Sequence, residues 1–109
     1  MTVGQKNIVP GVVLGATVAT YHTAPASTRE RICNATLTND TAAVITCTVH
    51  VVSSGGSAGT LNKKISAYPL APGETYTCPE LIGRVLEPGD SIQALGDGAA
   101  FDVSAFTQV

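Results

Sequence analysis

The sequence predicts an all-β protein, a single β-sandwich or jelly roll of seven to eight short, mainly antiparallel strands with a flexible N-terminal arm. Three observations predict this class. Short segments alternate polar with apolar residues, as half-buried strands do. Pro-Gly and Asn-Asp pairs separate these segments at short intervals, as turns do. No long segment has the apolar period of an amphipathic helix. The length of 109 residues is typical of one domain.

The N-terminal residues predict an arm. Residues 1 to 11 contain few large apolar side chains and end in Pro10-Gly11, so we expect a segment that is mobile unless another surface holds it. Residues 12 to 109 form the expected sandwich domain. A secretion signal is the alternative for Lys6 and the apolar stretch from Ile8 to Ala19, but Pro10-Gly11 interrupts that stretch, which favours a mature, uncleaved chain.

The first strand of the domain is predicted from Val12 to Thr23, because this stretch is rich in Val and Thr and alternates from Thr17 onwards. Pro25 and Ser27 then interrupt it. No apolar run in the sequence approaches the roughly 20 residues of a membrane-spanning helix, so we expect a soluble protein.

A β-hairpin is predicted from Arg29 to Ser53, where two alternating runs flank the turn-forming group from Asn39 to Thr41. A three-residue loop would pair Leu37 with Ala43, Ala35 with Ile45 and Cys33 with Cys47, and so place apolar residues opposite one another. A one-residue slip would move the two apolar rows to opposite faces, so this register is strongly favoured. The outer face would then carry polar β-branched residues and His50.

The remaining elements follow from turn chemistry. Residues 53 to 60 form a Gly- and Ser-rich loop. A short edge strand is expected before Pro69, since proline cannot donate to a sheet ladder. Pro-Gly pairs predict type II turns that start further strands, and one helical turn fits between them. The expected segments are a strand over 61–70, turns at 71–74 and 87–90, strands over 75–78 and 91–95, a helical turn over 79–83, a turn at 96–98 and a last strand over 99–109.

Composition excludes several classes of function. Only 13% of the residues are charged, and the net charge is −2 without any basic run. The electrostatic footprint that nucleic-acid binding requires is therefore missing, and the case for an anionic membrane partner fails for the same reason. Disorder is also excluded, because it requires low hydrophobicity and high net charge.

No catalytic, cofactor-binding or metal site is expected, and the protein is predicted not to be an enzyme. His22 and His50 have no ligand partner nearby in sequence, so both are interpreted as surface residues. Cys33 and Cys47 are expected to act as small core hydrophobes, although their predicted opposition would allow a disulfide under oxidising conditions. Cys78 has no neighbour that would lower its pKa.

The charged residues have structural interpretations. Glu74, Asp90 and Asp97 lie at predicted turns, where carboxylates hydrogen-bond to the backbone, and the acidic spacing of a calcium loop is absent. The cluster from Arg29 to Arg31 is typical of charges that protect the edge of a strand from aggregation.

Four segments carry a resemblance to a known class of proteins: Ala35–Asn39, Val49–Gly56, Ala71–Leu81 and Val85–Ala94. Their turn-and-strand sequences resemble small structural proteins of tailed bacteriophages and prophages. The resemblance implies a β-sandwich or jelly-roll unit of the virion, either a capsid cement or decoration protein or a small neck, tail or fibre component. It implies no catalytic residue.

The leading hypothesis is therefore a non-enzymatic virion protein that stabilises a phage shell by binding across neighbouring capsid subunits, through its arm and one sheet face. Its partners would be the major capsid protein or other virion proteins, and it would form a homo-oligomer or symmetric assembly there. A self-associating neck, tail or fibre component is the first alternative. A carbohydrate-binding sandwich is the second, but three Tyr, two Phe and no Trp offer few aromatic platforms for a sugar.

Overall fold

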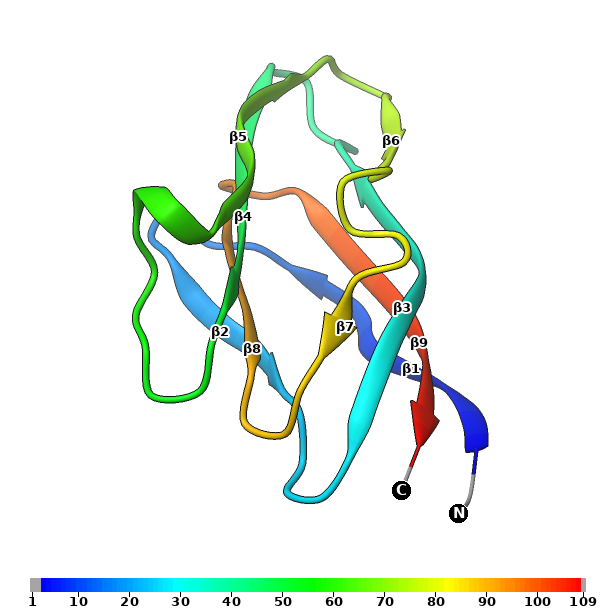
Figure 1. The fold of residues 1–109 in the computed structure, drawn as a ribbon. Coiled ribbons are helices and arrows are strands. Elements are labelled where there is room, and N and C mark those ends of the chain that lie inside the picture. Colours follow the sequence, from blue (N-terminus) through cyan, green and yellow to red (C-terminus); the bar gives the residue numbers. More distant parts are fainter. Residues whose placement is uncertain (1–2, 109) are drawn as a thin grey trace.

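The computed structural model describes residues 3 to 108 of the chain (Figure 1). These residues form nine strands and one short 3-10 helix. In chain order the elements are β1 (Val3–Val13), β2 (Ala19–Thr23), β3 (Arg29–Thr38), β4 (Ile45–Val52), η1 (Thr60–Asn62), β5 (Lys63–Leu70), β6 (Thr75–Thr77), β7 (Val85–Leu86), β8 (Ser91–Leu95) and β9 (Ala100–Gln108).

The strands form two antiparallel sheets, which we call sheet A and sheet B. Sheet A has the order β1-β9-β3-β6, and β7 also pairs with β3. Sheet B has the order β2-β8-β4-β5. The two sheets face one another, with sheet B on the left of Figure 1 and sheet A on the right. The all-β prediction is confirmed, and the arrangement is that of a β-sandwich.

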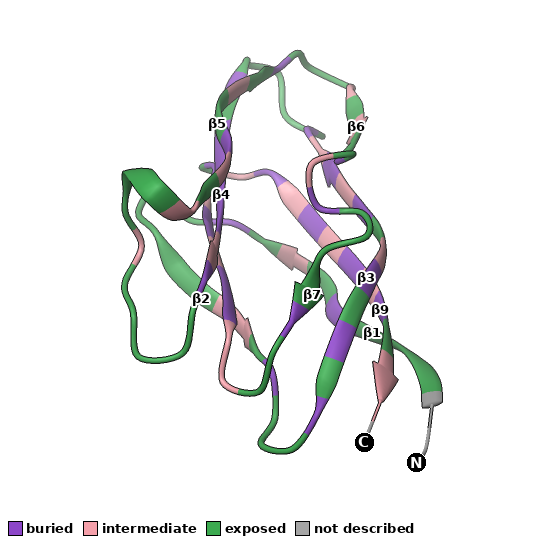
Figure 2. Cartoon of the chain, in the orientation of Figure 1, coloured by how far each residue is buried: buried purple, intermediate pink, exposed green. Residues whose placement is uncertain are grey.

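The core lies between the two sheets and comes from alternate residues of each strand. On β9, Phe101, Val103 and Ala105 are all fully buried, as their alternation predicts. The purple and pink bands along β9 in Figure 2 show this pattern directly. Sheet B contributes the facing layer, in which the fully buried side chains include Cys47, Val49, Ile92 and Ala94.

The prediction of an N-terminal arm is wrong for residues 3 to 11, whereas residues 1 and 2 lie outside the described part of the chain. Residues 3 to 13 form β1, which pairs antiparallel with β9 from Val3 opposite Gln108 to Val13 opposite Ala100. Pro10-Gly11 does not end this strand, because the register shifts there and Gly11 takes a φ of +67° that forms a bulge. This strand and the two-residue β7, which the sequence did not predict either, bring the total among the described residues to nine instead of seven or eight. The surface that holds the segment is the protein's own last strand.

The predicted strand from Val12 to Thr23 divides in two. Val12 and Val13 complete β1 in sheet A, whereas β2 begins at Ala19 in sheet B. Leu14, between the two strands, is buried and hydrogen-bonds through its backbone N–H to the carbonyl of Ala99. The chain therefore crosses from one sheet to the other where the sequence pattern is continuous.

The predicted hairpin between β3 and β4 is also wrong, because β3 lies in sheet A and β4 in sheet B. Leu37 pairs with Tyr76 and Phe101 and not with Ala43. The buried Asn39 makes the crossing possible: its side-chain amide donates to the carbonyls of Ala43 (2.7 Å) and Leu70 (2.9 Å). The apolar rows of β3 and β4 are buried equally well whether they lie side by side in a hairpin or face one another across a sandwich, so the alternation alone does not distinguish the two arrangements.

The turn predictions hold. Gly73 and Gly89 have φ values of +80° and +89°, the region that type II turns require of their third residue. The backbone N–H groups of Glu74 and Asp90 close these turns onto the carbonyls three residues earlier, at 3.0 and 2.9 Å. The strand from Ser91 to Leu95 is confirmed at both ends. β5, which contains Pro69, is an edge strand of sheet B as expected.

The outer face of β4 is solvated only in part: Thr46 is exposed as predicted, but the next two outward residues are buried. Thr48 is 8% exposed and His50 is 6% exposed. The loop from Ser53 to Asn62 folds back against β4, and the His50 imidazole Nδ1 lies 2.8 Å from the side-chain oxygen of Asn62. The loop that composition identifies as flexible therefore covers part of sheet B.

Candidate functional site

The outer face of sheet A carries a row of side chains that runs across four strands. Antiparallel register places Phe106 of β9 opposite Gln5 of β1 on one side and opposite Arg31 of β3 on the other. Arg31 in turn lies opposite Val85 of β7. Cross-strand neighbours on one face contact one another, so Gln5, Phe106, Arg31 and Val85 form one continuous surface, which we call the Phe106 row.

The Phe106 row exposes apolar side chains to solvent, whereas the solvated face of a sheet is usually polar. Phe106 is 46% exposed and Val85 is 43% exposed. Ile82, in the turn before β7, is 41% exposed. Phe106 faces outward because its neighbours in the alternation, Ala105 and Val103, occupy the core. Clustered exposed apolar residues are typical of an interaction site.

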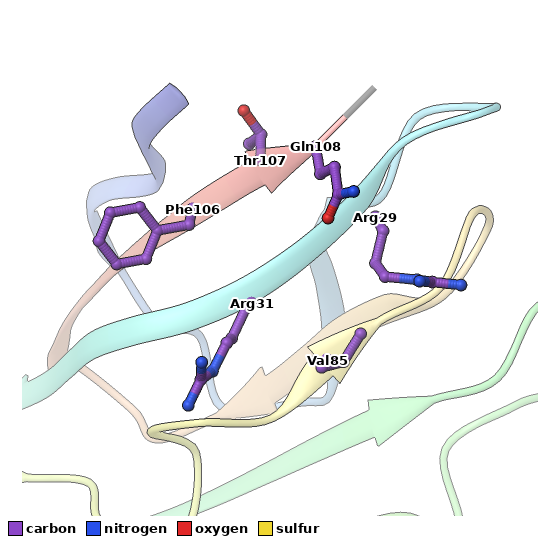
Figure 3. Close-up of a pocket in the computed structure, with 6 residues that line it drawn as sticks. All are labelled: Arg29, Arg31, Val85, Phe106, Thr107 and Gln108. Atoms are coloured by element: carbon purple, nitrogen blue, oxygen red, sulfur yellow. The ribbon is translucent and has the colours of Figure 1, made fainter. Parts of the chain in front are cut away.

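Two adjoining hollows lie along the row. One is lined by Arg29, Arg31, Val85, Phe106, Thr107 and Gln108, drawn in Figure 3, and has a volume of about 280 Å³. The other, of similar volume, is lined by Arg31, Ile32, Cys33, Ile82, Gly83 and Phe106. Arg31 and Phe106 border both hollows, so these two side chains are the centre of the site. Among the described residues, neither lining contains a carboxylate.

The two arginines of the site differ in their partners. The Arg29 guanidinium donates to a carboxylate oxygen of Glu87 at 3.0 Å, on an exposed part of the surface. Arg31 is exposed and makes no ion pair within residues 3 to 108. Glu30, between them in sequence, points to the opposite face and is fully buried. Contrary to the prediction, the cluster from Arg29 to Arg31 does not protect the edge of a sheet. At these residues β3 is paired with β9 on one side and with β7 on the other.

Both histidines lie against hydrogen-bonding partners, and the prediction that they are free surface residues is wrong. The His22 side chain is 12% exposed, and its Nε2 lies 2.5 Å from the carboxylate Oε1 of the buried Glu30. This contact joins β2 of sheet B to β3 of sheet A. His50 contacts Asn62, as described above. Within the described residues, no group of three or more His, Cys, Asp or Glu side chains is placed to hold a metal ion.

Two of the three acidic turn residues, Glu74 and Asp90, hydrogen-bond to the backbone, as the sequence predicts. The Glu74 carboxylate accepts a hydrogen bond from the N–H of Ala71 at 2.8 Å. The Asp90 carboxylate accepts from the N–H groups of Glu87 and Ser54, both at 3.0 Å. These groups stabilise turns, and within the described chain neither belongs to a group of three or more His, Cys, Asp or Glu side chains that could hold a metal ion.

Two stacked tyrosines join the edges of the two sheets. Tyr68 of β5 and Tyr76 of β6 have ring centroids 4.1 Å apart. The Tyr76 hydroxyl donates to the Glu80 carboxylate at 2.8 Å, and the Tyr68 hydroxyl donates to Glu74 at 3.3 Å. Burial, followed by the hydrogen bond and the negative charge of Glu80, raises the pKa of Tyr76 to about 12. The pair closes the side of the sandwich between β5 and β6.

A pH dependence follows from the raised pKa of Tyr76. The folded value of about 12 exceeds the unfolded value of about 10, so the contribution of Tyr76 to stability is fully present below pH 10 and is lost as the pH rises through 12. Between pH 9 and pH 11.5, the urea midpoint should fall more steeply for the wild-type protein than for Tyr76→Phe. Cys78, whose negative charge also raises the pKa of Tyr76, is present in both proteins, so the difference between the two profiles reports the removal of the Tyr76 hydroxyl; parallel pH profiles would contradict this assignment.

The three cysteines occupy separate positions, and the predicted opposition of Cys33 and Cys47 is wrong. Cys33 lies in sheet A at a register shift of β3, half-buried, with its thiol 3.4 Å from the carbonyl of Ser104. Cys47 is buried in sheet B. Burial raises the pKa of Cys47, and burial, Glu80 and Cys47 together raise the pKa of Cys78 to about 12. All three are free thiols.

These positions predict an order of thiol reactivity. Only thiolates react with iodoacetamide, so at pH 8 the native protein should be alkylated at Cys33 first, while the buried Cys47 and Cys78 should react at the rate of global or local unfolding. Mass spectrometry of time points would give the order. Equal labelling of all three cysteines in the folded protein would contradict the burial described here, and labelling in urea provides the control.

Sequence reasoning missed the Phe106 row. Phe106 and Arg31 are 75 positions apart in the chain, and only the pairing of β9 with β3 brings them together. The available signal was the alternation of β9, which leaves Phe106 on the face opposite Phe101, Val103 and Ala105.

Within residues 3 to 108, no helix has the length and apolar character that crossing a bilayer requires. No protein-family model, curated protein or solved structure matches this chain. The Phe106 row on a β-sandwich is thus the feature from which function has to be argued.

Proposed function

We propose that this protein is a non-enzymatic structural component of a bacteriophage virion, a cement or decoration protein that binds across neighbouring capsid subunits through the outer face of sheet A. The exposed side chains of the Phe106 row are the observation that supports this docking surface. The phage context rests on the resemblance of the turn-and-strand segments between residues 35 and 94.

The composition of the row suits protein binding. Aromatic residues and arginine dominate the energetics of protein interfaces, and charged residues are otherwise depleted from interface cores. Phe106 and Arg31 supply these two side-chain types at the centre of a face whose other outward residues include Gln5, Asn34 and Ser104. Burying this face against a shell would add contact area between subunits and so raise the barrier to disassembly.

The mechanism differs from the one the sequence suggested. Residues 3 to 13 belong to β1, so they contribute through a folded sheet and do not reach out as an arm. Gln5 of β1 lies beside Phe106 in the row. A preformed sheet face loses less conformational entropy on binding than a segment that must become ordered.

Binding to shells tests the proposal. We expect the protein to co-sediment with shells assembled from the capsid protein encoded next to its gene. Phe106→Ala or Arg31→Ala should each weaken this binding about 30-fold, the equivalent of about 2 kcal/mol for a central interface residue. Val44→Ser is the matched control, because Val44 is 62% exposed but borders a different hollow, with Leu95 of sheet B.

Two results would overturn the proposal. Shells that bind the Phe106→Ala and Arg31→Ala variants as tightly as the wild-type protein would exclude this face as the docking surface. Intact virions that carry the labelled protein only on the tail would exclude the cement role.

A second candidate is a self-associating neck, tail or fibre component. The observation that favours it is the outer edge of β1, an 11-residue strand that pairs with no strand other than β9 within residues 3 to 108. Unpaired strand edges can pair with another chain. Light scattering of the isolated protein distinguishes the two: a stable trimer or ring supports self-association, and a monomer supports the cement role.

A further inference from the structure

We propose that the hollows around Arg31 form a binding site for a carboxylate that is carried beside an apolar side chain, as in an acidic and apolar segment of a partner polypeptide. This inference deepens the proposed function by naming the chemistry that the docking face selects. The site itself can be tested without any shell.

The surface around Arg31 carries positive charge. The lining residues that the structure describes carry two guanidinium groups and no carboxylate. The Glu87 carboxylate is paired with the Arg29 guanidinium at 3.0 Å. Arg31 has no ion pair in the described part of the chain. On a protein whose net charge is −2, this is a local positive site that an anionic group would complement.

The hydrogen-bonding geometry of the Arg31 guanidinium suits a carboxylate. A guanidinium carries its donors in a planar fork that matches the two oxygens of a carboxylate, and such bidentate pairs are among the strongest hydrogen-bonded contacts in proteins. Arg31 projects from a strand held on both sides, by β9 and by β7. Its backbone is therefore fixed, and less freedom is lost when a carboxylate binds.

The apolar side chains beside Arg31 favour an organic carboxylate over an inorganic anion, because only the organic group carries an apolar part that can contact them. Phe106 lies on the β9 side of Arg31, and Val85 lies on the β7 side. Ile82 and Phe106 border the second hollow together with Arg31. An apolar group that enters beside the carboxylate would bury these exposed side chains and exclude water from the ion pair, which strengthens it.

Amide chemical shifts of isotope-labelled protein test the site with small probes. N-acetyl-phenylalanine supplies an apolar ring and an α-carboxylate that stands in for the partner's side-chain carboxylate. We expect it to shift the amide resonances of Arg31, Val85 and Phe106 in a saturable way. N-acetyl-phenylalaninamide, which lacks the charge, should bind at least tenfold more weakly. Acetate and inorganic phosphate, which lack the apolar group, should also bind at least tenfold more weakly.

Two variants assign the effect to Arg31. Arg31→Gln should weaken the binding of N-acetyl-phenylalanine at least tenfold while leaving the rest of the spectrum folded. Lys63→Gln removes the same charge from β5, on the other sheet, and should leave binding unchanged. Equal binding of the acid and the amide, equal binding of phosphate, or full binding to Arg31→Gln would each overturn the carboxylate site.

The outcome separates this inference from the proposed function. If N-acetyl-phenylalanine binds at Arg31 but no shell binds the protein, the carboxylate site stands and the cement role fails. If shells bind through Phe106 but the acid and the amide bind equally, the docking face stands and the carboxylate preference fails.

Discussion

Deletion of residues 1 to 10 is expected to unfold the protein. The deletion removes most of β1 and with it Ile8 and Val9, which are 5% and 0% exposed in the core. Burial of two such side chains contributes about 3 to 6 kcal/mol, and β9 loses its ladder partner along one side. Because small domains are stable by only about 5 to 15 kcal/mol, this loss removes most or all of the free energy of unfolding. Circular dichroism and urea titration would measure it.

A point substitution in the same strand provides the control. Lys6 is an exposed residue of β1, and Lys6→Ala should change the free energy of unfolding by less than about 0.5 kcal/mol. A truncated protein that unfolds cooperatively at the wild-type urea midpoint would show that β1 is dispensable. The segment would then be an arm, as its composition first suggests.

Breaking the contact between His22 and Glu30 is expected to cost about 3 to 5 kcal/mol, the range found when one member of a buried pair is removed. The Glu30 carboxylate is fully buried, and its second oxygen, Oε2, has no hydrogen-bond partner among the described residues. His22→Leu would leave this carboxylate inside the sandwich without the hydrogen bond from His22, the one that the described residues give it. The free energy of unfolding from urea titration is the measurement.

A double-mutant cycle separates the contact from the burial of each residue. The combined variant His22→Leu with Glu30→Leu should recover most of the loss, because two apolar residues need no partner in the core. Strictly additive effects would show that the two side chains do not interact. Arg29→Gln, which breaks the exposed contact with Glu87, is the surface counterpart and should cost less than about 1 kcal/mol.

Local chemistry made the turns and many strands predictable. Gly73 and Gly89 follow proline in turns whose third residue needs a positive φ, and few other residues adopt that conformation. The strand from Ser91 to Leu95 begins where such a turn ends. The buried side of β9 was predictable for the same reason, since alternation is a property of the strand itself.

Pairing between strands was not predictable in the same way. The runs before and after Asn39 each have one apolar face, and these faces can meet side by side in a hairpin or face to face in a sandwich with equal burial. The structure adopts the second arrangement, in which the Asn39 amide bonds to carbonyls at the crossing. For residues 3 to 13, the missing information was the partner, because a strand of modest apolarity is stable only when another strand accepts its hydrogen bonds.

The sequence by itself determined that this protein is all-β, where most of its turns lie, and which residues of β9 enter the core. Only the tertiary structure decided that β1 belongs to the fold, that Glu30 lies inside while Arg29 and Arg31 lie outside, and that Phe106 meets Arg31. The physical reason is the range of the interactions. Turn geometry and alternation act over a few neighbouring residues, whereas a surface such as the Phe106 row exists only when strands distant in the chain are brought into register.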